Sequence, residues 1–192
     1  FFLPLLCPRQ ITFLAKAEYF NGTTPVGRLQ KWFFTNVGQR PVNRTSASAG
    51  QDALNTAVEV LNDGDLFGIY PEGTRSPDGR LYKGKTGVAR IALASGAQVI
   101  PVAMIGTRDV NPIGTWFPRP GKVRVKVGDP IYPIEFVNNR GLERDSYEAI
   151  RALTDHIMRQ LQQLSGQEYA DVYAAEVKKA LAEGGDSSPH NP

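Results

Sequence analysis

One short segment of the chain gathers the groups that could hold an anion, Tyr70-Pro71-Glu72-Gly73-Thr74-Arg75-Ser76. The guanidinium of Arg75 offers charge and paired donors, the hydroxyl of Thr74 offers a further donor, and Gly73 allows a close approach to the backbone. These groups suit a phosphate or a similar anion. They also suit a solvated turn with a surface ion pair between Glu72 and Arg75, and this chemistry alone leaves both interpretations open.

The elements on either side place this segment in a loop. Residues 65–69 form an apolar run typical of a short buried strand, and a glycine-containing turn at 62–65 precedes them. A helix is expected over residues 86–95. The segment therefore follows the carboxyl end of a strand, which is where open α/β sheets usually bind ligands.

The rest of the chain alternates between strand-like and helix-like patterns. Further strands are expected over 11–15, 37–42, 97–105 and 122–127, and further helices over 25–33, 46 or 48 to 62, 143–164 and 167–182. The run at 97–105 is typical of a strand buried on both faces, although Pro101 favours an edge position or a bulge. The alternation predicts an α/β fold with a mixed, largely parallel sheet flanked by helices, and with a C-terminal helical extension. We expect an α/β domain over 1–140, helices packed on it over 141–183, and a disordered tail over 184–192.

Composition limits the classes of partner. The chain has 192 residues, 41% of them hydrophobic, and a formal net charge of +3, which suits an anionic substrate or membrane surface and does not indicate nucleic acid. The single cysteine, Cys7, excludes an internal disulfide framework. No run approaches the length of a transmembrane helix, so we expect any membrane contact to be peripheral or to come from a part of the protein outside these residues. The chain opens on an apolar stretch without an initiating methionine, and we expect it to be the interior of a longer protein.

Two aromatic segments have more than one interpretation. Trp32 and Phe33 share the expected 25–33 helix with basic residues, which suits either core packing or a membrane interface. Trp116 and Phe117 lie in a loop rich in proline and glycine, which suits a lid or a tip that faces a membrane.

Residues 79–86, Gly-Arg-Leu-Tyr-Lys-Gly-Lys-Thr, match the P-loop pattern in full. In a P-loop, Lys85 would contact the phosphates and Thr86 would bind magnesium. A P-loop should follow directly from a buried strand, but residues 71–78 separate the expected strand from Gly79. We interpret the match as chance, although Lys83 and Lys85 would still add positive potential near the loop.

Four features together resemble the glycerolipid acyltransferases of the 1-acylglycerol-3-phosphate acyltransferase type, in the form found in actinobacteria. Residues 70–76 are similar to the third signature block of that family, residues 38–44 to the second, residues 99–102 to the fourth, and residues 1–4 to the segment after the first. The resemblance implies acyl transfer from acyl-CoA or acyl carrier protein to the free hydroxyl of 1-acylglycerol 3-phosphate, which forms phosphatidate. A variant that uses glycerol 3-phosphate or another lipid-linked alcohol as the acceptor stays open. It implies no cofactor, no metal and no nucleic acid, and a peripheral position at the cytoplasmic face of the cell membrane.

The family's first block, H-x-x-x-x-D, is missing from these residues. Its histidine is the general base that a hydroxyl nucleophile needs near neutral pH. The two histidines of the chain, His156 and His190, do not match the block, and we assign His156 no catalytic role. We therefore expect the block to precede Phe1 in the parent protein, and the chain alone to be nearly inactive.

The resemblance also implies roles for residues that the chain does contain. Arg44 and Arg75 would hold the acceptor's phosphate, Gly73 and Thr74 would shape the loop, and Lys16 would add a third cation. Glu72 would support the site by placing the acceptor or ordering the arginines, and a salt bridge within the loop is the alternative. Three cations at three strand ends suit a phosphomonoester. Two other classes stay open, a non-catalytic domain that binds lipid or phosphate, and a P-loop nucleotide-binding protein.

Overall fold

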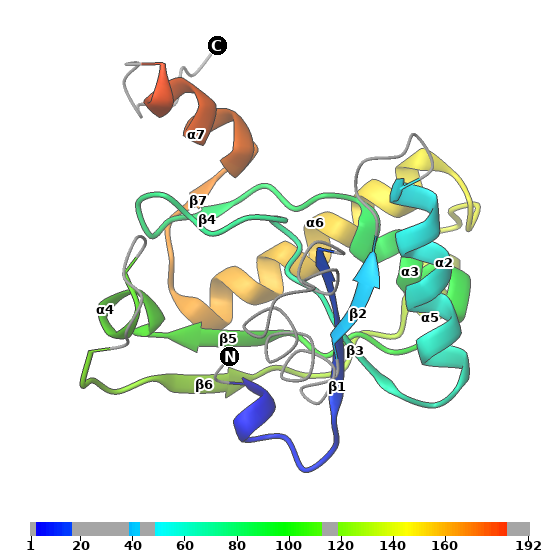
Figure 1. Cartoon of the computed structure of the whole chain (residues 1–192). Helices are drawn as coiled ribbons and strands as arrows, with labels where there is room; N and C mark the ends of the chain where they lie inside the picture. Colours follow the sequence, from blue (N-terminus) through cyan, green and yellow to red (C-terminus); the bar gives the residue numbers. More distant parts are fainter. Residues whose placement is uncertain (1–2, 17–38, 43–48, 113–118, 184–192) are drawn as a thin grey trace. The chain divides into compact units, whose positions relative to one another are not determined.

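The computed structural model describes residues 3–16, 39–42, 49–112 and 119–183 (Figure 1). The chain divides into two compact units, Phe1–Ile69 and Tyr70–Pro192. The expected 25–33 helix, the cap of the following helix, and Trp116 and Phe117 lie outside the described residues.

The first unit contains a parallel sheet of order β2-β1-β3. Its strands are β1 (Ile11–Lys16), β2 (Gln39–Val42) and β3 (Leu66–Gly68), and a short 3-10 turn, η1 (Leu3–Leu5), precedes them. Phe13 lies opposite Gln39 on one side of β1, and Ile11 lies opposite Leu66 on the other. The helix α2 (Ala49–Asn62) packs against β2 and β3 and buries Ala57 and Val60. The strands predicted over 11–15, 37–42 and 65–69 and the helix predicted up to residue 62 are confirmed. Their observed ends differ from the predicted ends by at most three residues.

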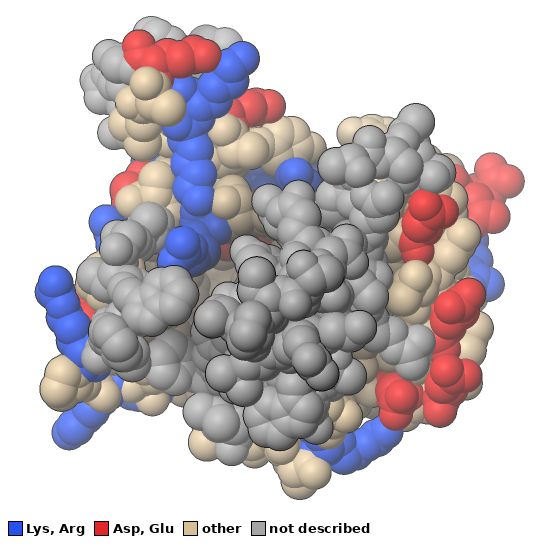
Figure 2. Space-filling model, viewed as in Figure 1, with Lys and Arg blue, Asp and Glu red and all other residues tan. Residues whose placement is uncertain are grey.

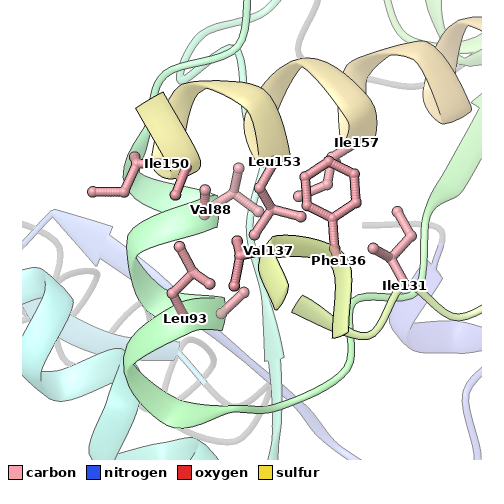
Figure 3. Packing of buried hydrophobic residues seen from close by; sticks show 11 residues of the cluster. Val88, Leu93, Ile131, Phe136, Val137, Ile150, Leu153 and Ile157 are labelled. Atoms are coloured by element: carbon pink, nitrogen blue, oxygen red, sulfur yellow. The ribbon is translucent and has the colours of Figure 1, made fainter. Parts of the chain in front are cut away.

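The second unit is organised around three helices, α3 (Gly87–Ser95), α5 (Pro133–Asn138) and α6 (Tyr147–Ser165). Leu153 and Ile157 of α6, one helical turn apart, meet Val88 of α3 and Val137 of α5 in one hydrophobic cluster (Figure 3). Burial of this apolar surface is the main source of stability for the unit. The antiparallel pair of β5 (Val102–Ile105) and β6 (Arg124–Val127) packs on α6, and the short α4 (Thr107–Val110) follows β5.

A second, smaller cluster joins two distant segments of the same unit. The short strands β4 (Leu81–Tyr82) and β7 (Tyr169–Ala170) pair in parallel, and α7 (Ala174–Ala182) follows β7. The side chain of Tyr82 is fully buried and contacts Ala170 and Ala174. The C-terminal segment is thereby attached directly to the strand that follows the Tyr70–Ser76 loop.

Several expected elements differ in the structure. The helix expected from residue 143 begins at Tyr147, because Ser146 caps it and accepts a hydrogen bond from the Ala149 N–H. The segment expected as one helix over 167–182 is β7 followed by α7. The strand expected over 97–105 begins only at Val102, since Pro101 has no N–H for a ladder, and Ile100 is 47% exposed rather than buried.

The α/β class is confirmed. Three of the four strand pairs among the described residues are parallel, and these strands form three small sheets. The division of the chain at residues 140 and 183 stays a prediction. Within the described ranges, none of the helices combines the length and the apolar character that crossing a membrane requires.

Candidate functional site

The loop of residues 70–76 closes as a tight turn. The Gly73 N–H donates to the Tyr70 carbonyl oxygen at 3.0 Å, and Gly73 has a φ of 72°. This left-handed conformation costs little for glycine, and it is unfavourable for residues that carry a β-carbon. The glycine therefore fixes how Thr74 and Arg75 leave the turn.

The carboxylate of Glu72 ties this turn to β4. Its Oε2 accepts a hydrogen bond from the Tyr82 N–H at 2.9 Å. Burial raises the pKa of Glu72, while the Tyr82 N–H and the positive charge of Lys178 act in the opposite direction. Among the described residues no ion pair joins Glu72 to Arg75, so the surface pair that the sequence left open is not what holds this turn.

Lys85 runs along the other side of the turn. Its N–H donates to the Pro71 carbonyl oxygen at 2.8 Å, which fixes the backbone just before α3. A β-carbon built at residue 73 would lie 3.3 Å from Lys85 Cδ and Cε. The flexible Lys85 side chain therefore passes directly over the glycine, and its exposed ammonium adds positive charge beside it.

Arg75 faces solvent. Within the described part of the chain its guanidinium has neither a hydrogen bond nor an ion pair, and the residue is exposed. An unpaired guanidinium next to a hydroxyl and a glycine turn is suited to a bidentate bond with a phosphate.

Residues just after the loop form a rigid support for it. Asp78 accepts hydrogen bonds from the Arg80 N–H at 3.0 Å, from Arg80 Nε at 2.7 Å, and from the Tyr82 hydroxyl at 2.8 Å. Burial would raise the pKa of Asp78, but these donors and the Arg80 charge together lower it to about 2. Ser76 Oγ accepts from the Gly79 N–H at 2.9 Å. Asp78 thus stays ionised at neutral pH and holds the exit of the loop in one conformation.

Sequence reasoning missed one basic residue at this loop. Lys178 of α7 donates from Nζ to Thr74 Oγ1 at 2.7 Å, across 104 residues of sequence. Lys178 lies in no motif. The one signal was the helical spacing of Ala174, Val177 and Lys178, which places the three on one face of α7.

The structure argues against the P-loop interpretation. Residues 79–86 contain β4, in which Leu81 and Tyr82 are buried, and Gly84 is buried against Met158. A segment that pairs as a strand cannot also wrap its N–H groups around a phosphate chain. The match of residues 79–86 to the pattern is therefore best explained as chance.

For two other predicted site residues, Lys16 and Arg44, the structure describes no side chain. Arg44 is not among the described residues, and of Lys16 only the backbone is described, at the end of β1. Their proximity to Arg75 stays a prediction. His156 packs against Phe136, with ring centroids 4.8 Å apart, and its pKa is lowered by burial and by the charges of Arg159 and Arg140. This environment agrees with a packing role.

Residues 1–105 match the family model described as acyltransferase, which is more than half of the chain. The chain belongs to the acyltransferase family. A chloroplastic 1-acyl-sn-glycerol-3-phosphate acyltransferase from Brassica napus is 35% identical over 102 residues, which are 53% of this chain and 30% of that protein. The chain therefore spans less than a third of that relative's length.

Two bacterial acyltransferases match over more of the chain. A 1-acyl-sn-glycerol-3-phosphate acyltransferase from Bacillus subtilis is 27% identical over 83% of this chain and 71% of its own length. The crystal structure of the 1-acyl-sn-glycerophosphate (LPA) acyltransferase PlsC from Thermotoga maritima superposes with a TM-score of 0.58 at 31% identity. The superposition covers 81% of this chain and 57% of the PlsC chain, so this chain shares the fold of PlsC over that region.

Proposed function

We propose that the protein transfers an acyl group from acyl-CoA or acyl carrier protein to the free hydroxyl of 1-acylglycerol 3-phosphate, forming phosphatidate. The observation that carries the proposal is the Gly73 turn, which presents an unpaired Arg75 beside the Thr74 hydroxyl in a chain of the acyltransferase family. The names of the relatives support the choice of acceptor.

The reaction has simple requirements. The acceptor's hydroxyl oxygen attacks the thioester carbonyl, a C–O bond forms, the C–S bond breaks, and the proton of the hydroxyl ends on the departing thiolate, which leaves as the thiol. Arg75 and Thr74 would bind the phosphate and so hold the hydroxyl at a fixed distance from it. Such positioning lowers the entropy cost of bringing two substrates together. Glu72 would serve the site by fixing the turn to β4, as its hydrogen bond to Tyr82 supports.

We further propose that the protein works as a peripheral protein at the cytoplasmic face of the cell membrane. The acceptor and product proposed here are both membrane lipids, and the chain carries a formal net charge of +3. Arg124 and Lys126 are exposed on β6 and would favour an anionic surface.

The test replaces Arg75 with alanine. Residues 1–192 contain no H-x-x-x-x-D, so acyl transfer is measured on the full-length protein. Arg75→Ala should raise KM for lysophosphatidate about 10- to 100-fold, as expected for the loss of charge-assisted hydrogen bonds. Arg90→Ala is the matched control, because Arg90 is an exposed arginine on α3, away from the loop in sequence. Equal KM values for the two variants would refute the assignment.

One alternative has an observation behind it. The absence of the histidine block from residues 1–192 suits a domain that binds lipid or phosphate without catalysis. That function predicts retained binding of lysophosphatidate and no release of free thiol from acyl-CoA by the full-length protein. Thiol release that depends on the acceptor would eliminate it.

A further inference from the structure

Lys178, near the C-terminal end of the described residues, contacts the loop of residues 70–76, called the motif loop below. Its Nζ lies 2.7 Å from Thr74 Oγ1, and its charge also reaches the half-buried Glu72. In the space-filling view, Lys and Arg side chains gather below α7 (Figure 2). The loop therefore receives positive charge from an element that none of the four sequence blocks includes.

The position of Lys178 is fixed by packing. Ala174 is buried against Tyr82, and Val177 packs on the same cluster. Upstream, Lys83 pairs with Asp171 at 3.0 Å, and β7 pairs with β4. Lys178 follows Ala174 by four residues and Val177 by one, so it lies on the face of α7 that this cluster covers. By contrast, the side chain of Lys179 is 77% exposed, and its ammonium lies near the carboxylate of Glu183.

The direction of this hydrogen bond matters for the loop. An ammonium group can only donate, so Thr74 Oγ1 accepts, and the threonine keeps its own proton to donate elsewhere. Donation from a cation also polarises the hydroxyl and makes it a stronger donor. The hydroxyl is thus prepared to bind an anion beside Arg75.

We infer that Lys178 is a positioning residue, which holds the Thr74 hydroxyl as a donor toward the phosphomonoester of the acceptor and so favours phosphorylated acceptors. The inference rests on the proposed function of the loop. It makes α7 part of the acceptor site, although α7 lies outside the part of the chain that matches the family model.

The experiment compares two acceptors, lysophosphatidate and monoacylglycerol, in the full-length protein. Lys178→Met should raise KM for lysophosphatidate about tenfold. This is the loss of affinity expected when one hydrogen bond to a charged group is removed. It should leave kcat and the KM for monoacylglycerol unchanged within about twofold, because monoacylglycerol has no phosphate for this hydroxyl to bind. Lys178→Arg keeps the charge and the donor and should restore most of the affinity.

Two control variants separate positioning from simple attachment of α7. Lys179→Met removes a neighbouring lysine on the exposed face of the same helix and should behave as the unaltered protein. Asp171→Asn breaks the ion pair with Lys83, which also ties this segment, and it leaves every cation near the loop in place. If Asp171→Asn raises KM as much as Lys178→Met, the effect comes from attachment and the inference is wrong.

A double variant tests whether Lys178 acts through Thr74. If it does, Lys178→Met combined with Thr74→Val should be no worse than the more impaired single variant, since Lys178 has no hydroxyl to orient once residue 74 is valine. Additive losses would overturn the inference. Arg75→Ala separates the two levels of the argument. If Arg75→Ala leaves KM unchanged, the proposed phosphate site itself fails, whereas a loss in Arg75→Ala without one in Lys178→Met overturns only the role of Lys178.

Discussion

Replacement of Gly73 by alanine tests how the motif loop is built. Gly73 has a φ of 72°, and an L-residue with a β-carbon pays about 1–2 kcal/mol to adopt this left-handed conformation. The added β-carbon would also lie 3.3 Å from Lys85 Cδ and Cε. That contact costs little, because the far end of a lysine side chain can move aside.

The magnitude follows from comparison with a matched glycine. Gly87, the first residue of α3, has no positive φ, and a β-carbon there would meet nothing within 4 Å. Either Gly→Ala replacement restricts the unfolded chain and so stabilises the protein by about 0.4–1 kcal/mol. This contribution cancels when the two variants are compared. Gly73→Ala should therefore be about 1–2 kcal/mol less stable than Gly87→Ala.

The assay is equilibrium unfolding in urea of the 192-residue chain and both variants at pH 7. The expected difference corresponds to a factor of about 5–30 in the folding equilibrium constant. Gly73→Asn should fall between the two, because asparagine tolerates the left-handed region better than alanine. Equal stability of Gly73→Ala and Gly87→Ala would show that the turn does not require a left-handed residue, and would refute the reasoning.

Two further predictions concern the support of the loop and the core. Asp78→Asn should flatten the pH dependence of stability: the folded pKa of about 2 lies below the ordinary value of 3.8, so the stabilising contribution of Asp78 is present above pH 3.8 and is lost as the pH falls toward 2. Urea unfolding at pH 7, 4 and 2 checks this, and an unaltered slope in the variant would contradict it. Leu153→Ala should lower the free energy of unfolding by about 2–5 kcal/mol, because the fully buried side chain leaves a cavity among α3, α5 and α6. The same urea assay measures the loss, and a value below about 1 kcal/mol would show that the site collapses around the smaller residue.

Local patterns predicted those parts of the fold that depend on neighbours in sequence. The apolar run of β3, the helical spacing in α6 and the turn chemistry at Gly73 are each visible within one continuous segment of sequence. The α5 helix was missed because its six residues, from Pro133 to Asn138, are too few to show a helical period. β4 and β7 were missed because each has only two residues, and they form only where the two segments meet.

Of the candidate site, the residues of the 70–76 segment could be predicted from the sequence, and Lys178 could not. Glu72, Gly73, Thr74 and Arg75 share one segment, so their types and spacing could be interpreted together. Lys178 could not be found in this way, since its role depends on the packing of Ala174 and Val177 against Tyr82. Neither the docking of α7 nor the direction of its face toward Thr74 is encoded in a local motif.

The pairing of β4 with β7 also has a consequence for the order of folding. Gln167 Nε2 reaches the Gly79 carbonyl oxygen across 88 residues, and Lys178 reaches Thr74 across 104. Bringing such distant segments together costs loop-closure entropy before their contacts can stabilise the chain. We therefore expect these contacts to form late in folding. During synthesis, the motif loop emerges long before the strand and the helix that complete it. The hydrogen bond from Lys178 to Thr74 can therefore form only after α7 has left the ribosome, and a chain that ends before Tyr169 would leave β4 without its partner strand.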